Sequence, residues 1–138
     1  MAEEINLNDL ANTAKSAEKK IFVFLHTTDC GYCDSMIMFT LDDENIRDVL
    51  KKKFLLVDIN VKHDNTVIYR DFKGSGYDFA KHIGYNFYPS SVFIDGHNKI
   101  IYGQVGYVEE DDFLITLQYI SSGAYERMGL EEFQEDLD

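Results

Sequence analysis

The chain has 138 residues, 45% of them hydrophobic and 14% aromatic, which is enough for one compact domain with its own core. Its 13 basic and 25 acidic side chains give a formal net charge of −12, which argues against nucleic acid or an anionic membrane surface as a partner. No apolar stretch approaches the roughly 18 residues of a membrane span, and the only two cysteines are too close in sequence for a structural disulfide framework.

The first part of the chain predicts a helix and then a buried strand. Apolar residues recur at helical spacing over residues 7–19, and Asn6 or Asn8 can cap this helix. Residues 21–25 are apolar throughout, which is typical of a buried strand. The two cysteines follow this strand.

After the cysteines, the pattern predicts a helix that continues to about Thr40. The acidic segment 41–45 interrupts this helix and suits the start of another, which runs to Lys53. Residues 54–61 then form the second predicted strand.

Residues 62–76 are interpreted as an insertion on the surface. They are polar and unpatterned apart from Val67-Ile68-Tyr69, and they end in Gly74-Ser75-Gly76. Two interpretations of the segment are open: a solvated loop or, through His63 and Tyr69, a lip that contacts substrate.

The last third of the chain predicts a short helix, a hairpin and a longer helix. The short helix covers residues 77–84, and strands 91–95 and 99–104 flank Gly96-His97-Asn98, which has the chemistry of a hairpin loop. The longer helix covers residues 109–120. Helices and strands in this order predict an α/β fold with a mixed central sheet flanked by helices.

Residues 122–138 form an acidic C-terminal tail. From residue 126 onward it carries six acids and one base, interleaved with Leu130, Phe133 and Leu137. This composition predicts a short amphipathic helix or a partly ordered end. Its expected role is solubility, and the alternative is a docking surface for a basic partner.

The motif Cys30-Gly31-Tyr32-Cys33 lies between a predicted strand and a predicted helix, which points to redox chemistry. A thiolate in the first turn of a helix faces unpaired N–H groups and the positive end of the helix dipole, which favours a nucleophilic Cys30. Cys33, one turn on, can attack the mixed disulfide that Cys30 forms and release the reduced product. Asp29 and Asp34 oppose thiolate formation, so the balance of these effects stays open.

The chain resembles the thioredoxin superfamily over residues 21–120. The resemblance rests on the strand that leads into the cysteine pair, the lone proline in Tyr88-Pro89-Ser90, the hairpin around Asp95-Gly96, and Val105-Gly106-Tyr107 before the final helix. The break in the helix after Thr40 resembles the broken second helix of the thioredoxin-related SoxW-like group.

This resemblance implies one thioredoxin-like domain over residues 1–138, with a core at 21–120, an insertion at 62–76 before the proline, and the acidic tail at 122–138. It also implies a thiol-disulfide oxidoreductase, a disulfide reductase in the first place, that uses no cofactor and has Cys30 and Cys33 as its catalytic residues.

The resemblance further implies a cis peptide bond between Tyr88 and Pro89, with an ordinary turn proline as the alternative. The proline ring would lie beside the sulfurs, and the backbone of Tyr88 would be free to pair with an incoming substrate strand. The substrate-binding residues that it implies are Gly31, Tyr32, Tyr88, Pro89 and Gly106, with a capping position on the helix surface as the equal alternative for Tyr32.

The sequence departs from a standard thioredoxin at three places around the cysteines. Gly31-Tyr32 replaces Gly-Pro and matches the bacterial disulfide isomerases, so an isomerase or oxidant is the alternative activity. Asp29 stands where thioredoxins have a tryptophan. Phe24 stands where they have a buried acid, which removes the group thought to move a proton for the resolving thiol.

The expected partners are a disulfide-containing protein or small-thiol substrate and a dithiol donor that recycles the protein, which is expected to be a monomer. The periplasm is the expected compartment, with the cytoplasm as the alternative. A third hypothesis is a non-catalytic binding module. No metal is expected, because no second Cys-x-x-Cys accompanies the four histidines. His26 is interpreted as a strand-end residue with a structural hydrogen bond, or as a group that stabilises the thiolate.

Overall fold

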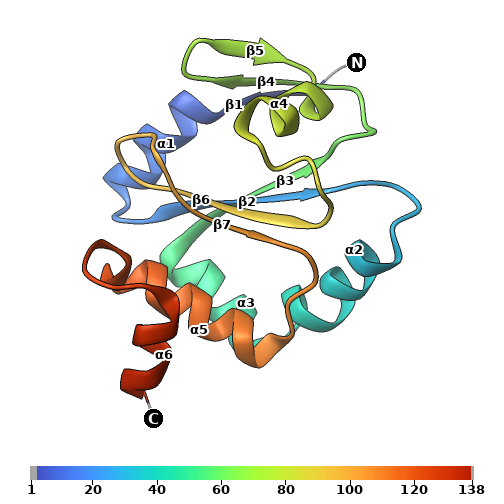
Figure 1. The fold of residues 1–138 in the computed structure, drawn as a ribbon. Coiled ribbons are helices and arrows are strands. Elements are labelled where there is room, and N and C mark those ends of the chain that lie inside the picture. Colours follow the sequence, from blue (N-terminus) through green and yellow to red (C-terminus); the bar gives the residue numbers. More distant parts are fainter. Residues whose placement is uncertain (1–2, 138) are drawn as a thin grey trace.

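The computed structural model describes residues 3–137, in which helices are interspersed with single strands and runs of strands (Figure 1). The strands are β1 (Glu3–Asn6), β2 (Lys20–His26), β3 (Phe54–Asn60), β4 (Asn65–Tyr69), β5 (Phe72–Gly74), β6 (Ser90–Ile94) and β7 (Ile100–Val105). The helices are α1 (Leu7–Ser16), α2 (Gly31–Ser35), the π-helix η1 (Met36–Leu41), α3 (Glu44–Lys53), α4 (Gly76–Ile83), α5 (Glu110–Ser121), the 3-10 helix η2 (Ala124–Glu126) and α6 (Leu130–Leu137).

Four strands form the central sheet in the order β3-β2-β6-β7. β2 pairs in parallel with β3 and antiparallel with β6, and β6 pairs antiparallel with β7. The predicted mixed sheet with flanking helices is therefore confirmed. Because β2 lies inside the sheet, its carboxyl end at His26 fixes where the chain enters the cysteine motif.

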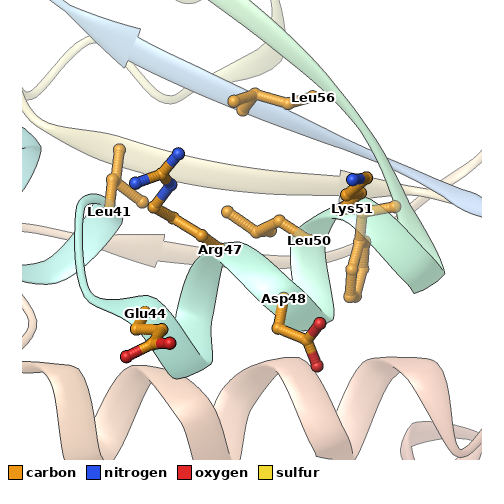
Figure 2. Close-up of a pocket in the computed structure, with 8 residues that line it drawn as sticks. Leu41, Glu44, Arg47, Asp48, Leu50, Lys51 and Leu56 are labelled. Atoms are coloured by element: carbon orange, nitrogen blue, oxygen red, sulfur yellow. The ribbon is translucent and has the colours of Figure 1, made fainter.

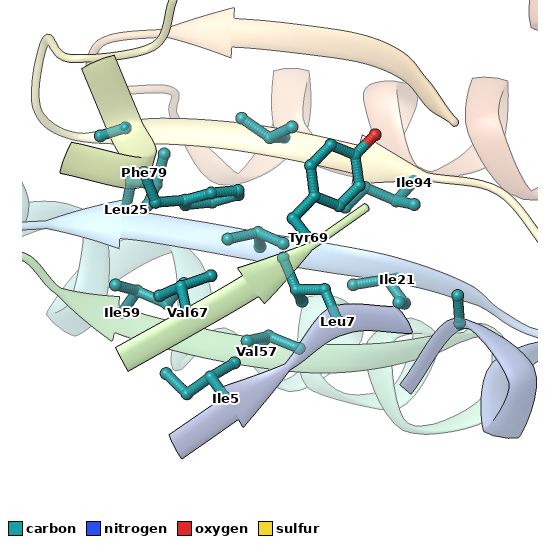
Figure 3. Packing of buried hydrophobic residues seen from close by; sticks show 14 of the residues in the cluster. Ile5, Leu7, Ile21, Leu25, Val57, Ile59, Val67, Tyr69, Phe79 and Ile94 are labelled. Carbon is teal, nitrogen blue, oxygen red and sulfur yellow. The ribbon is translucent and has the colours of Figure 1, made fainter. Parts of the chain in front are cut away.

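Both faces of the sheet carry a core, because successive side chains of a strand point to opposite faces. Ile21, Val23 and Leu25 pack on one face with residues of α1, α4 and β4, in the cluster that Figure 3 shows. Phe22 and Phe24 pack on the other face with residues of α3 and α5. With neither face of β2 open to water, the strand is apolar at every position from 21 to 25.

Residues 65–74 form two strands instead of a solvated loop. β4 pairs in parallel with β1, and β5 pairs antiparallel with β4. Val67 and Tyr69 are buried, and the Tyr69 hydroxyl donates a hydrogen bond to the Asn98 carbonyl over 2.9 Å. The solvated-loop interpretation is wrong for this part of the segment, because pairing with β1 and packing against the core cover it. The same contacts leave Tyr69 unable to serve as an exposed lip.

The N-terminal segment adds a strand that the sequence pattern did not predict, β1. The Asn6 side chain caps α1 by accepting a hydrogen bond from the Asp9 N–H over 3.1 Å. α1 ends at Ser16, three residues before the predicted end at Lys19. Glu18 has a φ of +58°, a left-handed conformation that cannot continue the helix.

The helix after the cysteines is broken near the predicted place. α2 passes into the π-helix η1, which ends at Leu41, and α3 begins at Glu44. The Asp43 carboxylate caps α3 by accepting hydrogen bonds from the N–H groups of Asn45 and Ile46 over 3.0 and 3.1 Å. The acidic segment therefore starts the new helix, as predicted, whereas the π-helical geometry was not predicted.

The acidic tail includes the helix α6, which packs beside α5. The rings of Tyr119 and Phe133 have centroids 5.5 Å apart, and the Tyr119 hydroxyl donates to the Met128 carbonyl over 2.6 Å. Phe133 and Leu130 are partly buried and pack against the core cluster around α5, while none of the α6 residues is fully buried. The tail is thus an amphipathic helix in this structure. No helix within residues 3–137 is long and apolar enough to cross a membrane.

Candidate functional site

The two cysteines lie at the start of α2. Cys30 is the N-cap of this helix, and its sulfur accepts a hydrogen bond from the Cys33 N–H over 3.1 Å. The two sulfurs form a disulfide bond. Cys33 is fully buried, whereas Cys30 is partly exposed. Of the two cysteines, only Cys30 is therefore open at the surface.

The segment that contains the lone proline lies against the cysteine pair. The Tyr88 carbonyl oxygen is 3.9 Å from the Cys30 sulfur, and the Tyr88–Pro89 peptide bond is cis. The Pro89 carbonyl accepts a hydrogen bond from the Gly106 N–H over 2.7 Å. Gly106 has a φ of +98°, which favours glycine. The structure thus brings together residues that the sequence analysis took from three separate segments.

Exposed apolar side chains occur on each of these three segments. Tyr32, between the cysteines, is 71% exposed; Phe87, just before Tyr88, is 66% exposed; and Val105, just before Gly106, is 54% exposed. A methyl group added at Gly31 would meet no atom within 4 Å, so the backbone there is open to an approaching molecule. Apolar surface around a reactive sulfur suits contact with a polypeptide.

The Tyr88 side chain is polar at its tip but finds no partner. Its hydroxyl oxygen is buried and makes no hydrogen bond within the described part of the chain. Burial raises the pKa of this hydroxyl, and the neighbouring Tyr77 raises it further. The phenol is therefore neutral at physiological pH.

His26 and Asp58 form a pair beneath the cysteine loop. The His26 Nε2 atom is hydrogen-bonded to the Asp58 Oδ1 atom, and the His26 ring stacks on Phe24 with centroids 5.1 Å apart. Only 9% of His26 is exposed. The hydrogen bond to Asp58 agrees with the interpretation of His26 as a strand-end residue with a structural hydrogen bond. Asp58 was missed in the sequence, although the parallel register sets Phe24 opposite it.

A hydrogen bond joins the helix after the cysteines to the loop that contains Gly106. Thr40, fully buried in η1, donates from its hydroxyl to the Val108 carbonyl over 2.5 Å. η1 follows the cysteine helix α2, and the β7–α5 loop contains Gly106, so this bond ties together two segments that adjoin the site.

The histidines are dispersed in the structure. His82 stacks on Phe72 with centroids 4.7 Å apart, and His97 lies in the β6–β7 turn, where its N–H donates to the Asp95 carboxylate. Across residues 3–137, no three His, Cys, Asp or Glu side chains are arranged to hold a metal ion.

The fold and the site define a thioredoxin-fold protein with a Cys-x-x-Cys disulfide at the start of a helix. A family model described as a thioredoxin-like domain matches residues 7–121, most of the chain. The chain therefore belongs to the thioredoxin-like domain family.

Solved structures agree with this fold. A thioredoxin-fold protein from Helicobacter pylori is 25% identical, has a TM-score of 0.70, and is matched over 87% of this chain and 80% of that one. A thioredoxin from Thermus thermophilus is 18% identical, with a TM-score of 0.66 and 86% of each chain covered. The reduced C-terminal domain of DsbD from Neisseria meningitidis is 16% identical, with a TM-score of 0.58 and coverage of 81% and 91%. The last two show the fold alone, and comparison with curated proteins finds no match.

Proposed function

We propose that the protein is a thiol-disulfide oxidoreductase that acts as a disulfide reductase through Cys30 and Cys33. The observation that carries this proposal is the partly exposed residue Cys30 at a helix N-cap, whose sulfur is bonded to that of a fully buried Cys33 one turn away. This arrangement separates an attacking sulfur from a resolving one. Membership of the thioredoxin-like domain family supports the same class of reaction.

The proposed reaction consists of two thiol-disulfide exchanges. The Cys30 thiolate attacks one sulfur of the substrate disulfide, which forms a mixed disulfide and releases the other substrate sulfur as a thiolate. The Cys33 thiolate then attacks the Cys30 sulfur, which closes the Cys30–Cys33 bond and releases the second substrate thiolate. An electron pair passes to the substrate, whose thiolates take up protons from solvent, and a dithiol donor reduces the protein again.

The substrate is proposed to lie over the residues that meet at Cys30. Gly31 leaves space for its backbone, and Tyr32 offers an exposed aromatic face. The Tyr88 carbonyl and the Gly106 loop flank the sulfur, with Pro89 between them. An extended substrate segment can pair with the backbone of Tyr88, as strands do when they add to a sheet edge.

The finer assignment within the family is to the SoxW-like group, supported by the break between η1 and α3. We propose that the protein is a monomer in the periplasm, with the cytoplasm as the alternative compartment. Within this assignment, residues 21–120 form the domain core, residues 62–76 are inserted into it, and residues 122–138 are appended to it.

A second candidate function is disulfide isomerisation or oxidation. The residues that favour it are Gly31 and Tyr32, because they match the dipeptide of the bacterial disulfide isomerases. The reduction potential of the cysteine pair distinguishes the two functions. A potential near or below roughly −250 mV supports the reductase, and one above about −180 mV supports the isomerase or oxidant. If no reversible couple is found, the protein is a binding module and the proposal is wrong.

Two serine variants test the roles of the cysteines. Cys30→Ser is expected to abolish reduction of a chromogenic aryl disulfide, because the accessible nucleophile is lost. Cys33→Ser is expected to accumulate a mixed disulfide on Cys30, visible by mass spectrometry, because the resolving sulfur is lost. Equal activity of Cys30→Ser and the parent protein would contradict the assignment.

A further inference from the structure

The outer edge of β3 has no strand partner. In the order β3-β2-β6-β7, β3 pairs with β2, and among the described residues no strand pairs with its other edge. β1, which lies across a recess from β3, pairs with β4 instead. An edge strand presents a row of unpaired N–H and C=O groups, which is a template for an added strand.

One face of this edge opens into a recess of about 510 Å³ between β1 and β3, here called the β1 recess. Its apolar lining consists of Ile5, Leu10, Leu55, Leu56 and Val57. The charged side chains around it are Glu3, Glu4, Asp9 and Asp58, of which Asp58 is hydrogen-bonded to His26, and no lysine or arginine of the described chain lines it. The β1 recess therefore favours cationic side chains with apolar stems.

The other face of the edge opens into the α3 groove, which consists of two adjoining cavities of about 720 and 330 Å³ between β3, α3 and the end of η1. Its apolar lining consists of Phe24, Ile37, Leu41, Leu50, Phe54 and Leu56. In Figure 2, Arg47 and Lys51 extend from α3 toward the sheet, whereas Glu44 and Asp48 point away from it.

The charges in the α3 groove disfavour a cationic side chain. Lys51 would repel it, and the acids at the far end already have partners. Asp42 forms an ion pair with Arg47 over 3.6 Å, and Asp58 is hydrogen-bonded to His26. The groove therefore suits apolar side chains, in contrast to the β1 recess.

Leu56 connects these two surfaces, because it lines the β1 recess and both cavities of the α3 groove and is 47% exposed. A strand added at the β3 edge would direct its side chains alternately to the two faces. We propose that the β3 edge binds an extended segment of a partner protein in which apolar and basic residues alternate. The apolar residues enter the α3 groove, the basic residues enter the β1 recess, and the main chain pairs with β3.

This surface is tested with the full-length protein and a fluorescent octapeptide of alternating valine and lysine. The control peptide has the same composition, with the four valines before the four lysines. The alternating peptide is expected to bind roughly tenfold more tightly than the control, as measured by fluorescence anisotropy. Its affinity is expected to fall when NaCl is raised from about 0.05 to 0.5 M, because the acidic recess is screened. Equal affinities for the two peptides would overturn the proposal.

Main-chain pairing is tested by N-methylation of the peptide and by hydrogen exchange. Methylation of one alternate set of peptide amides is expected to abolish binding, because those amides donate to β3. Amides within residues 54–60 are expected to exchange more slowly in the complex. Full binding by both alternately methylated peptides, with unchanged exchange in β3, would show electrostatic attraction without strand addition and would refute the proposal.

A matched pair of protein variants locates the site. Leu56→Lys is expected to weaken peptide binding at least roughly tenfold, because it adds a cation where the α3 groove accepts apolar side chains. Leu137→Lys, which changes a similarly exposed leucine on α6 (53% against 47%), is expected to bind like the parent protein. If the parent instead self-associates in sedimentation experiments and Leu56→Lys abolishes this, the occupant is a second copy and the partner proposal is wrong.

Discussion

Replacement of Thr40 by valine tests whether the buried hydrogen bond between η1 and the β7–α5 loop holds the site together. The Thr40 side chain is fully buried, and its hydroxyl donates to the Val108 carbonyl over 2.5 Å. Valine keeps the β-branched shape but has no donor, so the Val108 carbonyl loses this partner. Leaving a buried polar group without its hydrogen bond costs about 1–3 kcal/mol.

This cost predicts a measurable change in melting temperature. An entropy of unfolding of about 2.1 cal/mol/K per residue gives about 0.29 kcal/mol/K for the 138 residues of the chain. A loss of about 1–3 kcal/mol then lowers the melting temperature by about 3–10 °C. Urea unfolding of the Thr40→Val variant measures the same loss as a free energy.

Hydrogen exchange separates this explanation from a general loss of packing. In Thr40→Val, the amides of residues 104–109 are expected to exchange faster, because the loop around Gly106 has lost its tie to η1. Thr40→Ser keeps the donor and is expected to leave exchange in this loop unchanged. If the stability of Thr40→Val is within about 0.5 kcal/mol of the parent and loop exchange is unchanged, the bond does not hold the site.

Three further variants test the packing of the core and the titration of the buried Tyr119 hydroxyl. Phe22→Ala removes a fully buried ring stacked on Phe93 at 5.2 Å and is expected to cost about 3–5 kcal/mol in urea unfolding. Burial raises the pKa of the Tyr119 hydroxyl. Above a pH of about 10, the unfolded chain therefore loses the Tyr119 proton before the folded chain does, and the stability of the protein falls as the pH rises. Tyr119→Phe is expected to flatten this decline, measured as the urea midpoint at each pH. Gly103→Ala would place its methyl group 2.1 Å from the Cζ and hydroxyl oxygen of Tyr85. This variant is expected to lose about 1–3 kcal/mol of stability, seen as a lower melting temperature.

Much of the central sheet could be predicted from the sequence, because its signals are local. The run at residues 21–25 is apolar at every position, as a strand covered on both faces requires, and β2 extends it by one residue at each end. The hairpin is similar: its predicted strands differ from β6 and β7 by a single residue at each end. Turn residues and strand periodicity carry this information without reference to distant parts of the chain.

β4 could not be predicted, because its stability depends on distant contacts. Asn65 is buried, which local polarity argues against, yet its amide donates to the Asn60 carbonyl over 3.3 Å and its carbonyl accepts from the Gly76 N–H over 2.8 Å. Gly76 lies 11 residues after Asn65, and Glu3, which is paired with Asn65, comes from the N-terminal strand β1. The sequence therefore looked like a solvated loop where the structure has a buried strand.

The candidate site likewise has residues that could be predicted from the sequence and one that could not. The cysteine motif and the lone proline are recognisable in the sequence, and the structure brings Cys30 and Tyr88 within contact distance. Asp58 was missed because its partner His26 is 32 residues away, and only the parallel register of β2 and β3 brings the two side chains together. Residue type alone does not reveal a register.

The segment that local patterns misjudged also explains why the β3 edge is open. β1 has only four residues, and all four are in register with β4, from Glu3 opposite Asn65 to Asn6 opposite Ile68. The side chain of Asn65 anchors β4 to the start of α4 through Gly76, so β1 is held on that side of the recess. β3 keeps an unpaired edge as a consequence, while its other edge supports β2 and, through β2, the position of the cysteines. The proposed redox site therefore follows the carboxyl end of β2, whereas the proposed peptide surface runs along the outer edge of β3.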